Sequence, residues 1–148
     1  MKKDVKIKLT SRHNRAGEEP EISEILAAGT YELTGDGEHR IIYEESQQIQ
    51  DENGKILTVK ALNTVRILDK NVEITRSGEA TSHMVFGIGQ KHSMNYNTPY
   101  GIIEMDILTN NLEKNIDEKL ITLKVEYDLN MENQLLSKSV IEYNIEYI

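Results

Sequence analysis

Apolar and polar residues alternate along most of this 148-residue chain, and no other feature constrains the fold as strongly. The segment 5–10 reads VKIKLT, the segment 121–129 reads ITLKVEYDL, and the segment 141–147 reads IEYNIEY. Successive side chains of a β-strand point to opposite faces of its sheet, so a period of two is typical of strands with one buried face. The pattern therefore predicts an all-β protein.

Short turn sequences separate the alternating runs. They read TGDGE at 34–38, DENGK at 51–55, LDKN at 68–71, RSGE at 76–79 and NMEN at 130–133. Asn53-Gly54 is a hairpin signal because both residues tolerate the positive φ of a type I′ turn. Strands joined by such turns are antiparallel neighbours. About nine strands are expected, near residues 3–12, 21–33, 38–48, 55–68, 71–77, 79–89, 99–109, 118–129 and 135–147.

Two segments leave the local structure open. The segment 21–28 suits a strand but also one helical turn, and the segment 111–118 suits a short helix or an irregular link. Neither changes the expected architecture. Many strands in a small protein predict a single antiparallel, mostly meander β-barrel of about eight to ten strands, because closure removes exposed sheet edges. We expect this one domain to cover residues 1–148.

The composition excludes several classes of protein. Cysteine is absent, so neither a disulfide nor a reactive thiol is expected. No apolar run reaches about eighteen residues, which predicts no membrane span, and the first residues lack the apolar stretch of a signal peptide. A cytoplasmic location is therefore expected. The net charge of −8 makes general nucleic-acid binding an unfavourable interpretation.

The charge is unevenly distributed, however. The first fifteen residues contain six lysines and arginines against a single acidic residue, Asp4. This basic first strand is either a solvated strand face or a docking strip for an acidic partner or for RNA.

Several short motifs occur in an order that resembles a known family. They are GTYELTG at 29–35, IIYEES at 41–46, VEITRSG at 72–78, MVFGIG at 84–89, YNTPYG at 96–101 and LKVEYDLN at 123–130. Together they are similar to the YwiB-like family of small bacterial proteins of unknown function. The resemblance implies a calycin-like barrel, similar to lipocalins and fatty-acid-binding proteins, and it brings no catalytic residues.

Arg76 is the most unusual residue on an inward side. It continues the inward side of the segment 72–78, and Glu45 continues that of the segment 41–46, because each lies two positions after an inward apolar residue. A guanidinium inside a barrel must be paired or hydrated. We therefore expect Arg76 to pair with Glu45, with Tyr43 as a hydroxyl partner.

This pair has three interpretations. It fixes the strand register, or Arg76 anchors a ligand carboxylate or phosphate, which arginine binds bidentately. In the third interpretation Arg76 lies at a wet barrel rim beside the Ser77-Gly78 turn.

Three more tyrosines complete the candidate ligand-binding set. Tyr127 lies on the inward side of the segment 121–129. Tyr96 and Tyr100 belong to the segment 90–101, which we expect to form a loop at one end of the barrel, because its asparagines favour turns. This loop is either a packed surface loop or a lid that contacts a ligand or a protein.

No catalytic or metal site is expected. His83 and His92 are separated by a spacing that is not typical of metal ligands. No serine lies in a GxSxG motif. The sequence therefore predicts a protein that is not an enzyme and has no cofactor.

Two functions remain open, and so does the oligomeric state. The first is a barrel that binds a small amphipathic or anionic molecule around Arg76, Glu45 and Tyr43. The second is a non-catalytic protein-interaction module with a filled core, which docks through the basic first strand or the 90–100 loop. A cavity of roughly several hundred Å³, which is the volume of typical ligand sites, would favour the ligand-binding barrel. A packed interior would favour the interaction module.

Overall fold

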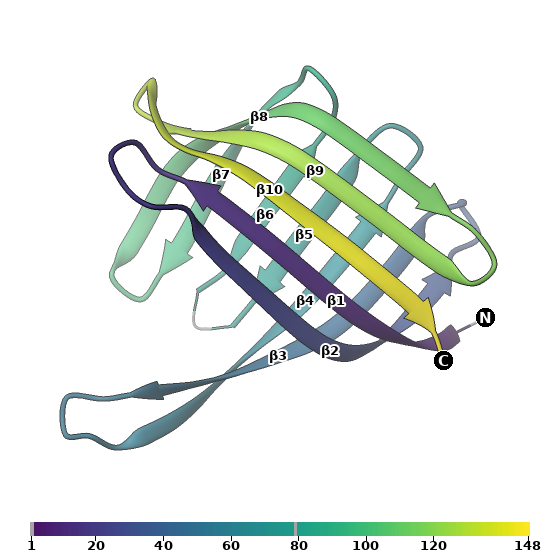
Figure 1. Ribbon diagram of the computed structural model, residues 1–148, viewed down its shortest axis with the longest axis horizontal. Coiled ribbons are helices and arrows are strands. Elements are labelled where there is room, and N and C mark those ends of the chain that lie inside the picture. The colour runs from purple at the N-terminus through teal and green to yellow at the C-terminus, as the bar shows by residue number, and fades with distance from the viewer. Residues whose placement is uncertain (1, 79) are drawn as a thin grey trace.

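A computed structural model describes residues 2–78 and 80–148. They form ten strands in one sheet that curls into a nearly closed barrel (Figure 1). Across these residues, no helix is long and apolar enough to cross a membrane. The strands are β1 Lys2–Asn14, β2 Glu21–Leu33, β3 His39–Gln50, β4 Ile56–Ile67, β5 Val72–Ser77, β6 Ser82–Phe86, β7 Lys91–Thr98, β8 Gly101–Ile116, β9 Leu120–Met131 and β10 Gln134–Tyr147.

The strand order is a meander that the first and last strands close. Strands that follow each other in sequence pair antiparallel from β1 to β6 and from β7 to β10, and β1 pairs with β10. The prediction of an all-β, antiparallel meander barrel of eight to ten strands is therefore confirmed. The sheet ends at β6 and β7, where a single bridge between Thr81 and Asn97 joins the two edges within the described residues. We call this line the seam.

The predicted alternation determines which side chains form the core. In β9 and β10, alternate residues are buried, and every second side chain faces outward. The largest fully buried side chains are Phe86, Ile7, Ile41, Ile67, Ile107, Ile121, Leu123, Ile145, Val5, Val65, Val72 and Val125. Burying apolar area is the main stabilising contribution to such a fold, at about 25 cal/mol per Å².

The prediction of a loop at 90–100 is wrong. Residues 91–98 form β7, which pairs with β8 from Lys91↔Leu108 to Thr98↔Gly101. Met94 is buried and Tyr96 packs against the core, so alternation continues through a segment rich in turn-forming residues. Packing of these two side chains outweighs the local preference of the asparagines for turns.

The two ambiguous segments are both strands. β2 includes all of 21–28, and β8 continues through 111–116 after a bulge between Thr109 and Asn111. The bulge inserts one residue into β8, which lets its inward side continue past the interruption. Nine predicted strands became ten because of the new strand β7 alone, since β8 is a longer form of a strand that was already expected.

The type I′ turn lies elsewhere than predicted. Glu132 and Asn133, between β9 and β10, have φ values of 51° and 63°, as a type I′ turn requires. At 51–55 only Gly54 has a positive φ, and the Asp51 carboxylate accepts hydrogen bonds from the backbone N–H groups of Asn53 and Lys55. This aspartate therefore selects a longer turn than the Asn-Gly pair alone suggests.

The barrel has two different ends. Odd-numbered strands finish at one end, where the inward positions hold polar side chains; we call it the polar end, and it includes His13, Glu45, Asn63, Arg76 and Ser139. Even-numbered strands finish at the other, which we call the apolar end. There the inward residues are apolar and buried, among them Val5, Ile67, Val72, Phe86 and Ile121.

Candidate functional site

Arg76 and Glu45 form an ion pair at the polar end. The Arg76 guanidinium donates to Glu45 Oε2 at 2.8 Å, and the side chain of Asn63 donates to Glu45 Oε1 at 3.1 Å. Asn63 stands beside Arg76 in the β4–β5 register and beside Tyr43 in the β3–β4 register, and Glu45 lies one inward position further along β3. The Glu45 side chain is 14% exposed and that of Arg76 is 35% exposed, so the arginine is the more accessible of the two side chains. The predicted pairing is confirmed.

Tyr43 does not act as the hydroxyl partner of this pair. Its hydroxyl lies 2.9 Å from that of Tyr143, which projects from β10 across the barrel. Burial raises the pKa of Tyr43 to about 12, and burial also raises the pKa of Tyr143. The two phenols therefore remain neutral and bond to each other rather than to the Arg76–Glu45 pair.

A second polar group lies across the same end. His13 Nδ1 is 2.7 Å from the hydroxyl of Ser139, which is itself 3.2 Å from that of Ser137. Tyr127 is the β9 partner of Ser139; burial raises the pKa of Tyr127, and a hydrogen bond with Ser139 opposes this effect. Tyr127 is thus buried in the barrel and faces this second group.

The remaining candidate tyrosines lie in different environments. Tyr96 is partly buried and packs against the core from β7. Tyr100 lies in the turn after β7 and is almost fully exposed, so the structure does not bring it to the Arg76 group.

A hollow of about 480 Å³ opens at the seam above Arg76. Arg76 and Met94 lie on its lining together with small polar residues: Thr75, Ser77, Thr81, Ser82, His83, Ser93, Asn95 and Asn97. Thr81 and Asn97 exchange two backbone hydrogen bonds of 2.9 Å. Alternate residues of a strand present their backbone groups to the same edge, so His83 and Asn95 also present theirs to the seam. The hollow therefore combines a guanidinium with hydroxyl, amide and backbone groups.

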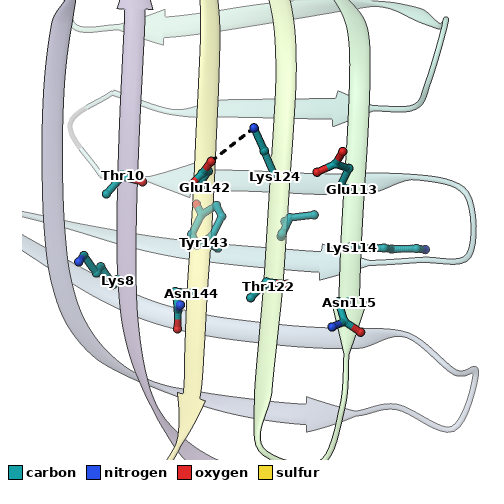
Figure 2. A pocket seen from close by; sticks show the side chains of 11 residues that line it. Lys8, Thr10, Glu113, Lys114, Asn115, Thr122, Lys124, Glu142, Tyr143 and Asn144 are labelled. Atoms are coloured by element: carbon teal, nitrogen blue, oxygen red, sulfur yellow. Dashed lines mark ion pairs between the residues drawn. The ribbon is translucent and has the colours of Figure 1, made fainter.

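Another hollow, of about 470 Å³, lies on the outer wall across β1, β10, β9 and β8 (Figure 2). Its charges are of both signs. Lys124 lies 3.7 Å from Glu142, and Lys8 lies 3.8 Å from Glu24 on β2. The basic first strand is thus flanked by acidic residues of its neighbours, which reduces the positive field that an acidic partner would meet.

Sequence reasoning did not identify Asn63, Tyr143, His13 and Ser139. The signal was present, because each lies an even number of positions from an inward apolar residue on its own strand. Within the described residues, no group of three histidine or acidic side chains is placed to hold a metal ion.

These features define a class: a small antiparallel barrel with one polar end and a seam above an inward arginine. The chain belongs to the family described as Domain of unknown function (DUF1934), whose model matches residues 7–143. The crystal structure of the ywiB protein from Bacillus subtilis is similar, with 17% identity, a TM-score of 0.79, and coverage of 99% of this chain and 93% of that chain. At this identity the likeness shows the fold.

A second solved structure is that of Ail, the attachment invasion locus protein of Yersinia pestis. It is 7% identical, with 99% of this chain and 97% of that chain covered, and its TM-score of 0.37 is too low to compare the folds. No curated protein matches the sequence significantly.

Proposed function

We propose that the protein binds a small anionic molecule in the seam hollow, with Arg76 as the anchor. One observation carries the proposal: an inward arginine lies on the lining of a hollow of about 480 Å³. Arginine presents five N–H donors in a planar fork, and the single bond of Arg76 to Glu45 leaves donors for a carboxylate or phosphate.

The position of the pair suits this role. The Glu45 carboxylate is the less exposed of the two groups and also accepts a hydrogen bond from Asn63. This arrangement fixes the guanidinium while its outer edge stays accessible, and a fixed donor loses less conformational entropy when it binds.

The lining favours an anionic ligand over an amphipathic one. Serine, threonine and asparagine dominate the hollow, and Met94 is the apolar side chain among them. The apolar side chains of the barrel interior pack against each other in one cluster. A long hydrocarbon chain of the kind that the calycin-like resemblance suggests would have to displace that cluster, so we propose a compact polar ligand.

Thermal unfolding in the presence of inorganic phosphate or succinate tests the proposal. A bound anion stabilises the folded state by about 2.7 kcal/mol at a concentration one hundred times its Kd. We expect Arg76→Met to abolish the stabilisation and Arg76→Lys to weaken it, because lysine lacks the bidentate fork. Arg12→Met on the exposed side of β1 is the control and should bind like the unmodified chain. Equal stabilisation of Arg76→Met would contradict the proposal.

The interaction module is the second candidate, and the packed core favours it. Its docking strip would be the outer face of β1, through Lys6 and Lys8. Replacing both by glutamate should abolish capture of an acidic polypeptide such as polyglutamate, while the melting temperature hardly changes, since surface changes rarely exceed about 0.5 kcal/mol. Undiminished capture would exclude this strip.

A further inference from the structure

The β3–β4 hairpin leaves the barrel. β2 and β3 pair only from Gly29↔Tyr43 to Leu33↔His39, and β4 pairs with β5 only from Leu62 onward. The residues 44–61, which we call the arm, therefore form a two-stranded ribbon whose two edges have no ladder to another described strand. Figure 1 shows this ribbon projecting beyond the rest of the barrel.

The edge that the arm leaves behind is also free. Residues 21–28 of β2 pair with β1 on one side, and on the other side their ladder to β3 stops at Gly29. A Cβ atom at Gly29 would lie 2.4 Å from the carbonyl oxygen of Ile42, so the two backbones approach there more closely than a side chain permits. The strands diverge from this crossing.

Both free surfaces expose large apolar side chains. Ile22 and Leu26 are largely exposed on the outer face of β2, and Ile56 and Leu57 are exposed on the arm. Long unprotected edges with apolar side chains are rare because they pair with other chains. An isolated two-stranded ribbon is also at best marginally stable in water. Both features indicate that another strand covers the arm.

We propose that two copies of this chain exchange their arms, so that the arm of each copy pairs with the 21–28 edge of the other. The pairing continues the existing β2–β3 register, in which Gly29 stands opposite Tyr43. Leu26 of one copy then faces Ser46 of the other, and Ile22 faces Gln50. These free edges are of similar length, and a two-fold arrangement pairs the 44–50 edge of both arms at once.

The facing residues suit this exchange. Continuing the register sets Glu24 opposite Gln48. The three rungs at Ile22, Glu24 and Leu26 therefore bring no two acidic side chains together. Gln50 already pairs with Ile56 inside the arm, so Ile22 and Ile56 would flank the same glutamine on one face. The exchange thereby shields apolar residues that each single copy exposes. It is independent of the anion site proposed above.

Cysteine cross-linking tests the exchange, since the chain has no cysteine of its own. Leu26→Cys and Ser46→Cys are made on separate chains, one with a size tag, and mixed under mild oxidation. Facing residues in an antiparallel pair have Cβ atoms about 4.5–5.5 Å apart, within reach of a disulfide. The matched control is Leu26→Cys mixed with Gln50→Cys, which lies on the same face but four residues out of register.

Exchange predicts a mixed disulfide that forms on the order of one hundred times faster than in the control mixture, because pairing gives the thiols a millimolar effective concentration. Leu26→Glu should raise the dimer dissociation constant about tenfold or more in sedimentation equilibrium. The control Ile102→Glu, a residue with the same exposure (68% against 66% for Leu26), should leave it unchanged.

Two results would overturn the proposal. One is equal cross-linking rates in the two mixtures. The other is a monomeric disulfide in a chain that carries both Leu26→Cys and Ser46→Cys, with none between separate chains, which would show that the arm closes on its own barrel.

Discussion

The two ends of the barrel are built from the same alternating strands, yet their inward positions hold different chemistry. At the apolar end, Val72 and Phe86 are completely buried and face each other across β5 and β6. At the polar end, the same two strands place Arg76 beside Ser82. Alternation thus determines whether a side chain points inward. The position of the residue along its strand determines whether that inward side chain lies in the apolar core or at the polar end.

The difference also shows in how charges are held. The Arg76–Glu45 pair lies on the inward side of its strands, where Asn63 also donates to Glu45 and the Arg76 side chain is 35% exposed. Near the apolar end, Glu38 lies on the outer wall, where Arg40 donates to it at 2.8 Å and Arg66 also donates. The hydrogen bond from Arg66 is the main reason that the pKa of Glu38 is lowered. The Glu38 carboxylate therefore accepts hydrogen bonds from two arginines. The arginine that binds Glu45 also lines the seam hollow.

The largest effect is expected from removing an apolar anchor. Phe86→Ala should lower the free energy of unfolding by about 3–5 kcal/mol, because it leaves a cavity beside Tyr127, whose ring centroid lies 5.0 Å away. Tyr96→Ala at the polar end should cost about 1–2 kcal/mol, since that side chain is only partly buried. Chemical denaturation measures both changes. Equal losses would mean that the two ends are packed alike.

The Arg76–Glu45 pair should give the next largest effect. Arg76→Met leaves the Glu45 carboxylate without its cation and should cost about 1–2 kcal/mol. A fully buried pair would cost about 3–5 kcal/mol, but solvent reaches this guanidinium. Adding Glu45→Leu should recover much of the loss.

A double-mutant cycle read by denaturation tests the coupling. Additive effects of the two substitutions would show that the pair contributes nothing to the fold.

Much of this architecture could be predicted from the sequence, because the strand period is local information. The inward direction of Arg76 and Glu45 follows from residues two positions away, and their contact was predicted for that reason. The arm could not be predicted in the same way. Residues 44–50 read EESQQIQ and lack apolar alternation, which does not by itself show where the chain goes, and their departure from β2 depends on the crossing at Gly29, which involves three strands.

The buried hydroxyl pair of Tyr43 and Tyr143 should have a smaller effect. Tyr143→Phe leaves the buried hydroxyl of Tyr43 without its partner at 2.9 Å and should cost about 1 kcal/mol. Tyr100→Phe is the control, because the Tyr100 side chain is almost fully exposed and its substitution should change nothing. Denaturation midpoints with an unchanged m-value report the difference. Identical midpoints for both variants would mean that water satisfies Tyr43.

The smallest effect is expected from two histidines, one at each end. His13 lies at the polar end beside Ser139, and His39 lies at the apolar end, 2.7 Å from the hydroxyl of Tyr31. Burial is the main cause that lowers the pKa of each imidazole below 6.5, and at His39 the charge of Lys114 lowers it further.

A lowered pKa in the folded state means that the unfolded chain takes up protons first as the pH falls. The free energy of unfolding should therefore decrease from about pH 7 downward, through the unfolded value of about 6.5, until the folded imidazoles are protonated as well. The loss should be the smallest of the changes predicted here, because both imidazoles are only partly buried. It precedes the loss from Glu38, whose pKa is lowered from 4.5 and whose contribution disappears only in more acidic solution. Denaturation curves of His13→Gln and His39→Gln at several pH values assign the slope to each end, and a slope that neither substitution reduces would contradict the assignment.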